Sequence, residues 1–200
     1  MRQPLPDPRR AVLLVIDMQE YFREIAAPIL PALARAIARA RERSVPVVYT
    51  QHGHDDPARD GGMLYEWWGE LIVTGTPGWQ LMGEIAPAPG EKIVPKRRYS
   101  AFHGTDLDEH LRRRGGHELV IAGVMSNLCC ETTARDAFVR DYRVFFLGDG
   151  TATADPALHR AALANLEYGF ATVLDCEQLM AALGRPTVPP TSGPEEARRR

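Results

Sequence analysis

The segment "HELVIAGVMSNLCCETTARDAF", residues 117–138, joins a continuous apolar run to a stretch with helical spacing. The first eight residues, His117–Val124, have the character of a parallel strand that is buried on both faces. Apolar residues then recur at i, i+4, i+7 and i+8, as on one face of a helix: Cys130, Ala134, Ala137 and Phe138. A strand followed directly by a helix is the unit from which α/β folds with parallel sheets are built.

The same alternation runs along the whole chain. Further strands are predicted at Ala11–Asp17, Val45–Gln51, Lys92–Lys96, Arg143–Asp149 and Ala171–Asp175. Helical patterns are predicted at Pro28–Arg43, Asp106–Arg114, Ser126–Asp141, Pro156–Tyr168 and Glu177–Leu183. Pro95 favours an edge position for its strand, because proline cannot donate to a ladder of backbone hydrogen bonds. The sequence therefore predicts an α/β fold with a mostly parallel sheet.

The chain of 200 residues, 44% hydrophobic and 25% charged, is long enough for one sizeable core. We predict a flexible segment at residues 1–10, one domain at residues 11–183 and a disordered tail at residues 184–200. The stretch Gly53–Pro89 is rich in Gly, Trp and Pro, which is typical of an excursion that shapes pockets.

The composition also bears on partners and location. A formal charge of −2 gives no reason to expect nucleic acid or an anionic membrane as a partner. Three cysteines, two of them adjacent, form no disulfide framework. The polar, Pro-rich start has no signal-peptide character, so we expect a reducing, cytoplasmic setting.

Ligands of an open parallel sheet bind beyond the carboxyl ends of its strands. Polar residues at these ends are therefore the candidates for a site. They are Asp17 after the first strand, Gln51, His52 and His54 after the second, Lys96 after the third, and the cysteine segment after the fourth.

The two adjacent cysteines have different predicted environments. With Ser126 or Asn127 as the helix N-cap, Cys130 belongs to the apolar stripe and is expected in the core. Cys129 lies about 100° around the helix and within its first turn. A helix N-terminus favours a thiolate and lowers a thiol pKa, so Cys129 is the candidate nucleophile. A free cysteine is also often only a small buried hydrophobic residue.

A nucleophilic thiol needs a partner that takes its proton and later protonates the leaving group. Asp17 ends a strand and can serve as this base, although an aspartate there can equally cap the next turn. Lys96 can supply positive charge, or it can be a solvated lysine in the basic run "KRR".

Three segments together resemble the isochorismatase-like cysteine hydrolases: "LLVIDMQEYF", "VPKRRYSAF" and "GVMSNLCCETTARDAF". That superfamily includes nicotinamidases, N-carbamoylsarcosine amidohydrolases, and biuret, triuret and ureidoacrylate hydrolases. The resemblance covers about residues 11–183. It implies a three-layer α/β/α fold with a six-stranded parallel sheet in the order 3-2-1-4-5-6, and a catalytic triad of Asp17, Lys96 and Cys129.

The resemblance also implies how the triad works. A non-proline cis peptide is expected at Val124–Met125, and the backbone N–H groups of Met125 and Cys129 are expected to form an oxyanion hole. Cys129 would attack the carbonyl carbon of a small amide, ureido or N-carbamoyl compound and form a thioester. Two alternatives remain: vinyl-ether hydrolysis without a covalent step, as in true isochorismatases, and a binding module that does not catalyse. The presence of Cys129 favours the amidohydrolase branch.

Nicotinamidases of this superfamily carry a metal site of the form D-x-H with a further His. In "TQHGHDD" His52 stands where that Asp would be, and His54 matches the first His. Two histidines are a weak metal signal, so we predict no metal and no cofactor.

The remaining candidates concern substrate binding and assembly. The residues expected to line the substrate pocket are Phe22, Gln51, His52, Trp67, Trp68, Tyr99 and Phe102. Trp67 and Trp68 can instead pack the excursion or fill a subunit interface. Arg97 or Arg98 can meet a substrate carboxylate or lie on the surface. The superfamily implies a small-molecule substrate and a homo-oligomer, either a dimer or a tetramer.

Overall fold

Six parallel strands form the centre of the structure, a computed structural model in which residues 5–184 are described. The strands are β1 (Ala11–Ile16), β2 (Val47–His52), β3 (Lys92–Lys96), β4 (Glu118–Val124), β5 (Arg143–Ala152) and β6 (Thr172–Leu174). Their order across the sheet is β3-β2-β1-β4-β5-β6, which confirms the predicted topology. Strand order reverses between β1 and β4, so these neighbours form the switch point where ligands bind in such sheets.

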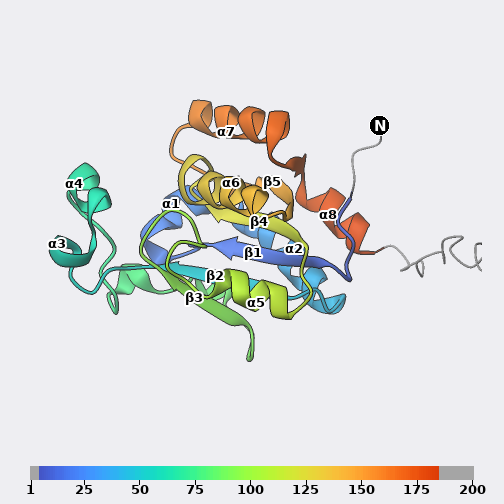
Figure 1. Cartoon of the computed structure of the whole chain (residues 1–200), viewed down its shortest axis with the longest axis horizontal. Helices are drawn as coiled ribbons and strands as arrows, with labels where there is room; N and C mark the ends of the chain where they lie inside the picture. The colour runs from blue at the N-terminus through green and yellow to red at the C-terminus, as the bar shows by residue number, and fades with distance from the viewer. Residues whose placement is uncertain (1–4, 185–200) are drawn as a thin grey trace, which may run out of the picture.

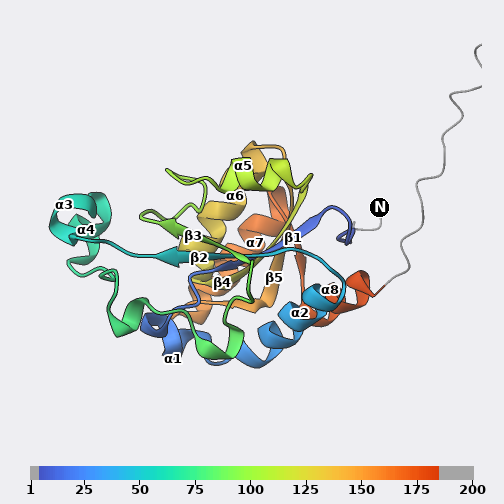
Figure 2. The same ribbon diagram turned by 90° about the horizontal axis from the view of Figure 1, so that it is seen from below.

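Helices cover both faces of this sheet (Figures 1 and 2). One face carries α5 (Leu107–Arg113), α6 (Glu131–Val139) and α7 (Pro156–Gly169). The other carries α1 (Arg23–Ala26), α2 (Leu30–Glu42) and α8 (Cys176–Leu183). The result is the three-layer architecture that the sequence predicts.

Strand β1 shows why its apolar run is continuous. Leu13 and Val15 pack on the α2 and α8 side, whereas Leu14 and Ile16 pack on the α5 and α6 side. Because successive side chains of a strand point to opposite faces, a strand covered on both sides needs apolar residues at every position. Strand β3 lies at the edge of the sheet, as Pro95 predicts.

The excursion between β2 and β3 contains two short helices, α3 (Pro57–Asp60) and α4 (Met63–Trp68). Both project from the body of the protein beyond the carboxyl end of β2 (Figures 1 and 2). Short 3₁₀ turns follow at η2 (Pro77–Trp79) and η3 (Gly83–Ile85), and a further one, η1 (Glu20–Phe22), follows β1. The excursion thus reaches the edge of the sheet where the candidate residues lie.

The cysteine helix differs from its prediction in two ways. It begins with a π-type turn, η4 (Ser126–Cys130), whose N-cap is Met125, so the predicted cap at Ser126 or Asn127 is wrong. Cys130, Ala134 and Ala137 are buried as predicted, but Phe138 is 46% exposed. Phe138 stands about 80° around the helix from Cys130, which places it at the border of the apolar stripe. It contacts Phe170 edge-on there, with ring centroids 5.4 Å apart.

The ends of the chain are described only in part. Within the predicted flexible segment, the Asp7 N–H donates to Glu118 Oε2 at 2.7 Å and Leu5 packs against the core. The predicted tail lies outside the described residues from residue 185 onward. Across residues 5–184, none of the helices has the length and apolar character needed to cross a membrane.

Candidate active site

Three side chains from separate segments meet at the carboxyl edge of the sheet. Lys96 Nζ lies 2.7 Å from Asp17 Oδ2 and 3.3 Å from Cys129 Sγ. The side chains of Asp17 and Lys96 are fully buried, and Cys129 is 8% exposed. The structure therefore brings together the three residues that the sequence indicates, with the ammonium between the carboxylate and the thiol.

Asp17 is held by the strand beside it. Thr50 Oγ1 donates to Asp17 Oδ1 at 2.6 Å and accepts the Asp17 N–H at 3.1 Å. The backbone of Asp17 has a φ of 49°, in the left-handed region that few non-glycine residues adopt. This conformation ends β1 and keeps the carboxylate inside the molecule. Thr50 carries no motif of its own; its place two residues before His52, on the same face of β2, is the only sequence signal for it.

Lys96 is surrounded by acceptors. Its Nζ forms an ion pair with Asp17 and donates to Cys129 Sγ and to the carbonyl oxygens of Arg98 at 2.9 Å and Tyr99 at 3.3 Å. Burial by itself would lower the pKa of Lys96, but the interactions with Asp17 and Cys129 outweigh burial and raise this pKa to about 12. The lysine is therefore charged at neutral pH.

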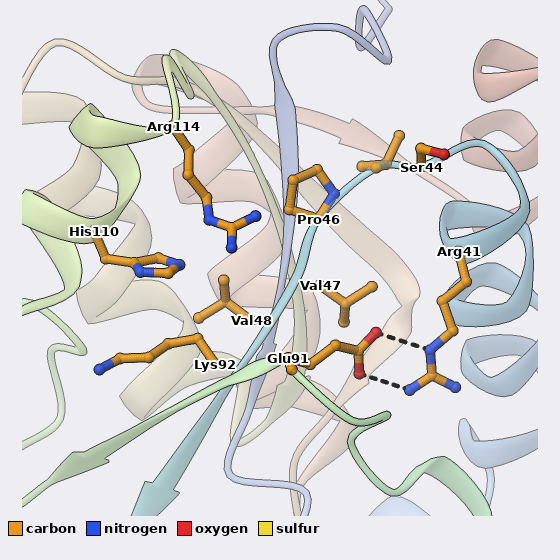
Figure 3. A pocket seen from close by; sticks show the side chains of 11 residues that line it. Arg41, Ser44, Pro46, Val47, Val48, Glu91, Lys92, His110 and Arg114 are labelled. Atoms are coloured by element: carbon orange, nitrogen blue, oxygen red, sulfur yellow. Dashed lines mark hydrogen bonds and ion pairs between the residues drawn. The ribbon is translucent and has the colours of Figure 1, made fainter.

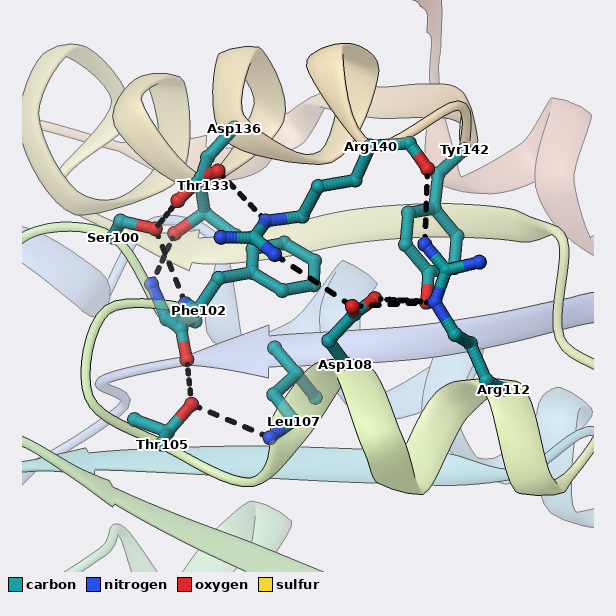
Figure 4. Close-up of polar contacts among 11 residues, drawn as sticks. Ser100, Phe102, Thr105, Leu107, Asp108, Arg112, Thr133, Asp136, Arg140 and Tyr142 are labelled. Atoms are coloured by element: carbon teal, nitrogen blue, oxygen red, sulfur yellow. Dashed lines mark hydrogen bonds and ion pairs between the residues drawn. The ribbon is translucent and has the colours of Figure 1, made fainter.

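The loop that supplies these two carbonyls is fastened to the cysteine helix (Figure 4). Ser100 Oγ donates to Asp136 Oδ2 at 2.5 Å, and the Ala101 N–H donates to Thr133 Oγ1 at 3.0 Å. Asp136 also accepts from Arg140 at 2.8 Å. Because Thr133 and Asp136 belong to the helix that follows Cys129, these bonds set the distance between the lysine and the thiol.

Cys129 follows a tight junction of strand and helix. The Val124–Met125 peptide is cis, and Gly123 before it has a φ of 115°. A Cβ at Gly123 would lie 2.0 Å from the carbonyl oxygen of Ile16, so only glycine allows β4 to approach β1 this closely.

The pKa of Cys129 contradicts the expectation from its helix position. Burial raises this pKa to about 12, and a hydrogen bond to Asp17 acts in the same direction, while Lys96 lowers it only in part. Desolvation thus outweighs the helix N-terminus. The resting side chain is a thiol, not a thiolate.

Two further contacts hold the turn that carries Cys129, and sequence inspection did not identify them. Ser126 Oγ lies 2.8 Å from His159 Nδ1, and Asn127 Oδ1 accepts from Thr153 Oγ1 at 2.7 Å. Both partners lie 26 or more positions away along the chain, so no local pattern indicates them.

Four of the seven predicted pocket residues line one of two clefts. Trp67, Trp68 and Tyr99 line one cleft of about 730 Å³, the tryptophan cleft, which also reaches Leu128 beside Cys129. Trp68 Nε1 donates to Tyr99 Oη at 2.8 Å and so ties the excursion to the loop after β3. Gln51 lines a second cleft of about 490 Å³, the lysine cleft, together with Lys96.

Phe22, Phe102 and His52 line neither of these two clefts. Phe102 is 5% exposed and packs in the core beside Tyr142, with ring centroids 5.8 Å apart. Phe22 packs against the core on the other face of the sheet. His52 lies directly across from Lys96 in the β2–β3 register, so its side chain flanks the lysine on the same face.

The two histidines do not fit a divalent metal site. Their rings lie 5.1 Å apart, and His54 Nδ1 bonds Asp60 Oδ1 at 3.0 Å. His52 Nδ1 and His54 Nε2 are buried without a hydrogen-bond partner, so two nitrogens are available as ligands. Asp60, the nearby carboxylate, is already bonded to His54 and Arg97. Within residues 5–184, no group of three His, Cys, Asp or Glu side chains is arranged to hold a metal. Two imidazoles are fewer than the three protein ligands that a stable site needs.

A smaller hollow of about 270 Å³ lies at the opposite edge of the sheet (Figure 3). It opens where β2 and β3 begin, whereas Lys96 ends β3. Arg41 in this hollow is paired with Glu91 at 2.8 Å. It is therefore separate from the buried triad.

The chain matches the isochorismatase domain over residues 11–178. It is 47% identical over 182 residues to "Nicotinamidase 3" of Arabidopsis thaliana, an alignment that covers 89% of this chain and 91% of the relative. It is 35% identical over 216 residues to "Ureidoacrylate amidohydrolase RutB" of Methylobacterium radiotolerans, covering 92% and 83% of the two chains.

Solved structures of similar proteins share the fold of this chain. A cysteine hydrolase from Pseudomonas syringae superposes with a TM-score of 0.84 at 28% identity, covering 92% of this chain and 98% of that one. An N-carbamoylsarcosine amidase from Thermoplasma acidophilum gives a TM-score of 0.74 at 29% identity, with coverage of 84% and 97%.

Proposed function

The chain belongs to the isochorismatase-like hydrolase family, and we propose that it is a cysteine-dependent amidohydrolase that cleaves a C–N bond in a small amide or ureido compound. Two of its relatives, a nicotinamidase and a ureidoacrylate amidohydrolase, are amidohydrolases.

One observation carries the proposal: a single buried ammonium contacts both a carboxylate and a thiol. Lys96 Nζ lies within 3.3 Å of both Asp17 and Cys129. A nucleophile, a base and a group that orients the base are the parts that covalent catalysis by a thiol requires. A purely structural ion pair has no need for a sulfur as its third member.

In the first half of the reaction Asp17 takes the proton of Cys129 while Sγ attacks the carbonyl carbon. The resulting oxyanion is stabilised by the backbone N–H groups of Met125 and Cys129. Asp17 then gives its proton to the departing nitrogen, the C–N bond breaks, and ammonia or an amine leaves. The acyl group stays on Sγ as a thioester.

In the second half Asp17 takes a proton from water, and the hydroxide oxygen attacks the thioester carbon. The C–S bond breaks, Sγ recovers the proton from Asp17, and the acid leaves. Amide and water are converted into acid and amine, and the enzyme returns to its starting state. Lys96 stays charged throughout, and its ammonium lies 2.7 Å from the Asp17 carboxylate that accepts and returns the protons.

The test is ammonia release from a panel of small amides, ureas and N-carbamoyl compounds, with intact-mass spectrometry to detect the acyl-enzyme. Wild-type protein should release ammonia from at least one class and show a mass adduct. Cys129→Ala should do neither. Cys130→Ala, a change at the neighbouring buried thiol, is the matched control and should retain activity.

Isochorismate belongs in the same panel, because vinyl-ether hydrolysis needs an acid but no nucleophile. If Cys129→Ala still hydrolysed isochorismate while no amide reacted, Asp17 would act as an acid alone and the proposal would fail. If no compound of the panel reacted, whether or not Cys129 was alkylated, the result would favour a binding module that does not catalyse.

A further inference from the structure

Arg98 is a half-buried cation beside the triad that lacks an acidic partner. Among residues 5–184 no carboxylate lies within ion-pair distance of its guanidinium. Its neighbour Arg97 differs, because Arg97 is exposed and pairs with both Asp55 and Asp60. A partly desolvated cation without a counter-ion is costly, so its persistence points to a ligand that supplies the missing charge.

The guanidinium is held in place by one of its three nitrogens. Nη1 donates to the carbonyl oxygens of Asp60 at 3.1 Å and Arg97 at 2.7 Å, which uses both of its hydrogens. The Nε and Nη2 hydrogens find no acceptor in the described part of the chain. Those two nitrogens form the edge of arginine that binds a carboxylate with two parallel hydrogen bonds.

A glycine in the neighbouring segment, Gly62, leaves space for the guanidinium of Arg98. Gly62 has a φ of 56°, and a Cβ there would lie 2.8 Å from Arg98 Nη2. Gly62 thus combines a left-handed backbone with close approach to the guanidinium, and glycine is the residue that tolerates both.

Arg98 is also close to the reacting atoms. Its carbonyl oxygen and Cys129 Sγ both lie within 3.3 Å of the same Lys96 ammonium. Its side chain lines both the tryptophan cleft and the lysine cleft. A ligand in either cleft can therefore contact Arg98, and the lysine cleft also reaches Lys96.

The formal charges around the site balance in sum, but they are not paired one to one. Asp17 and Lys96 neutralise each other, and Asp55 and Asp60 more than balance Arg97. His52 is neutral at physiological pH, because burial and Lys96 lower its pKa to about 4. Among these described charged side chains Arg98 is the one that has no oppositely charged group in contact, and an anionic ligand complements it.

We infer that Arg98 binds a carboxylate of the substrate, so that the preferred substrates are small amides or ureido compounds that carry an acid group. This inference rests on the proposed hydrolysis at Cys129 and adds the substrate class. It distinguishes acid-bearing substrates from neutral aromatic amides such as nicotinamide.

The test compares 3-ureidopropionate with n-butylurea, a neutral analogue of similar length. Arg98→Gln should raise KM for the acid about 10- to 100-fold, as expected for a lost pair of charge-assisted hydrogen bonds, with kcat nearly unchanged. Kinetics with n-butylurea should change less than about threefold. Arg97→Gln is the matched control and should change neither substrate.

A binding measurement separates this inference from the proposed function. In the Cys129→Ala background, calorimetry should show that Arg98→Gln weakens the affinity for 3-ureidopropionate by the same factor of about 10 to 100. The affinity for n-butylurea should stay unchanged. Equal effects on acid and neutral compound, or none on the acid, would overturn the inference even if ammonia release established the hydrolase. If Arg98→Gln does not fold, Arg98→Lys replaces it, because lysine keeps the charge but lacks the paired Nε and Nη2 donors. If Arg98→Lys then bound the acid as tightly as Arg97→Gln and the parent protein do, carboxylate binding by this pair of donors would be refuted.

Discussion

Removing the Lys96 ammonium should destabilise the protein far more than removing an ordinary lysine of the same strand. In Lys96→Met the aliphatic stem is retained while the charge is lost. Asp17, whose side chain is fully buried, then lacks the cation that stands 2.7 Å from its Oδ2. Breaking a buried ion pair by deleting one partner costs about 3–5 kcal/mol, because the remaining charge is left desolvated.

The same strand supplies the control. Lys92 Nζ pairs with Asp106 at 2.6 Å, a distance as short as that in the buried pair, but both partners are partly exposed. Exposed pairs contribute roughly 0–1 kcal/mol, so Lys92→Met should have little effect. Urea denaturation at pH 7.5 measures both free energies of unfolding, and the difference between the two variants isolates the effect of burial.

A double variant sharpens the comparison. Asp17→Asn with Lys96→Met removes both charges, so this variant should be more stable than Lys96→Met alone, although it is expected to be inactive. If Lys96→Met cost no more than Lys92→Met, the carboxylate would not be desolvated as the structure indicates. The reasoning about the triad's electrostatics would then be refuted.

Three other outcomes follow from the site. The free energy of unfolding should fall by about 2–4 kcal/mol between pH 9 and 12, because the Cys129 thiol ionises near pH 9 in the unfolded chain but keeps its proton to about pH 12 in the folded one. In a pH series of denaturation curves, Cys129→Ala should show a smaller fall. Gly123→Ala should leave little folded protein in circular dichroism melts, because its Cβ would lie 2.0 Å from the Ile16 carbonyl oxygen. Trp68→Phe should lose the hydrogen bond to Tyr99 yet keep the aromatic wall, so that KM changes less than about tenfold and an unchanged thermal midpoint shows that the fold is intact.

The apolar runs of the sequence contain most of the fold, because buried parallel strands must be apolar at consecutive positions. The predicted strand at Lys92–Lys96 has the same first and last residues as β3, and the predicted ends of the other strands lie within a few residues of the observed ones. The positions of Asp17, Lys96 and Cys129 at the carboxyl ends of strands made them candidates, but only the resemblance to the family grouped them as a triad.

The properties that depend on tertiary surroundings were not accessible in the same way. A helix N-terminus predicts a lowered thiol pKa, but the sequence does not show that Cys129 is enclosed, and burial reverses the direction. Phe102 stands beside Tyr99 and Lys96 in the chain, yet its ring turns into the core against Tyr142. Sequence proximity to a site residue says little about which way an aromatic ring points.

The raised pKa of Cys129 is compatible with nucleophilic chemistry, and it indicates when the proton moves. A thiolate in the resting site would place a second negative charge near Asp17, and burial disfavours it. Substrate binding changes this balance, because the charge that leaves Sγ during attack passes to the carbonyl oxygen, where backbone N–H groups can meet it. Proton transfer to Asp17 is thus expected to accompany attack rather than precede it. If so, the alkylation rate of Cys129 by iodoacetamide in the free enzyme should stay low below pH 9, while amide hydrolysis should proceed at neutral pH.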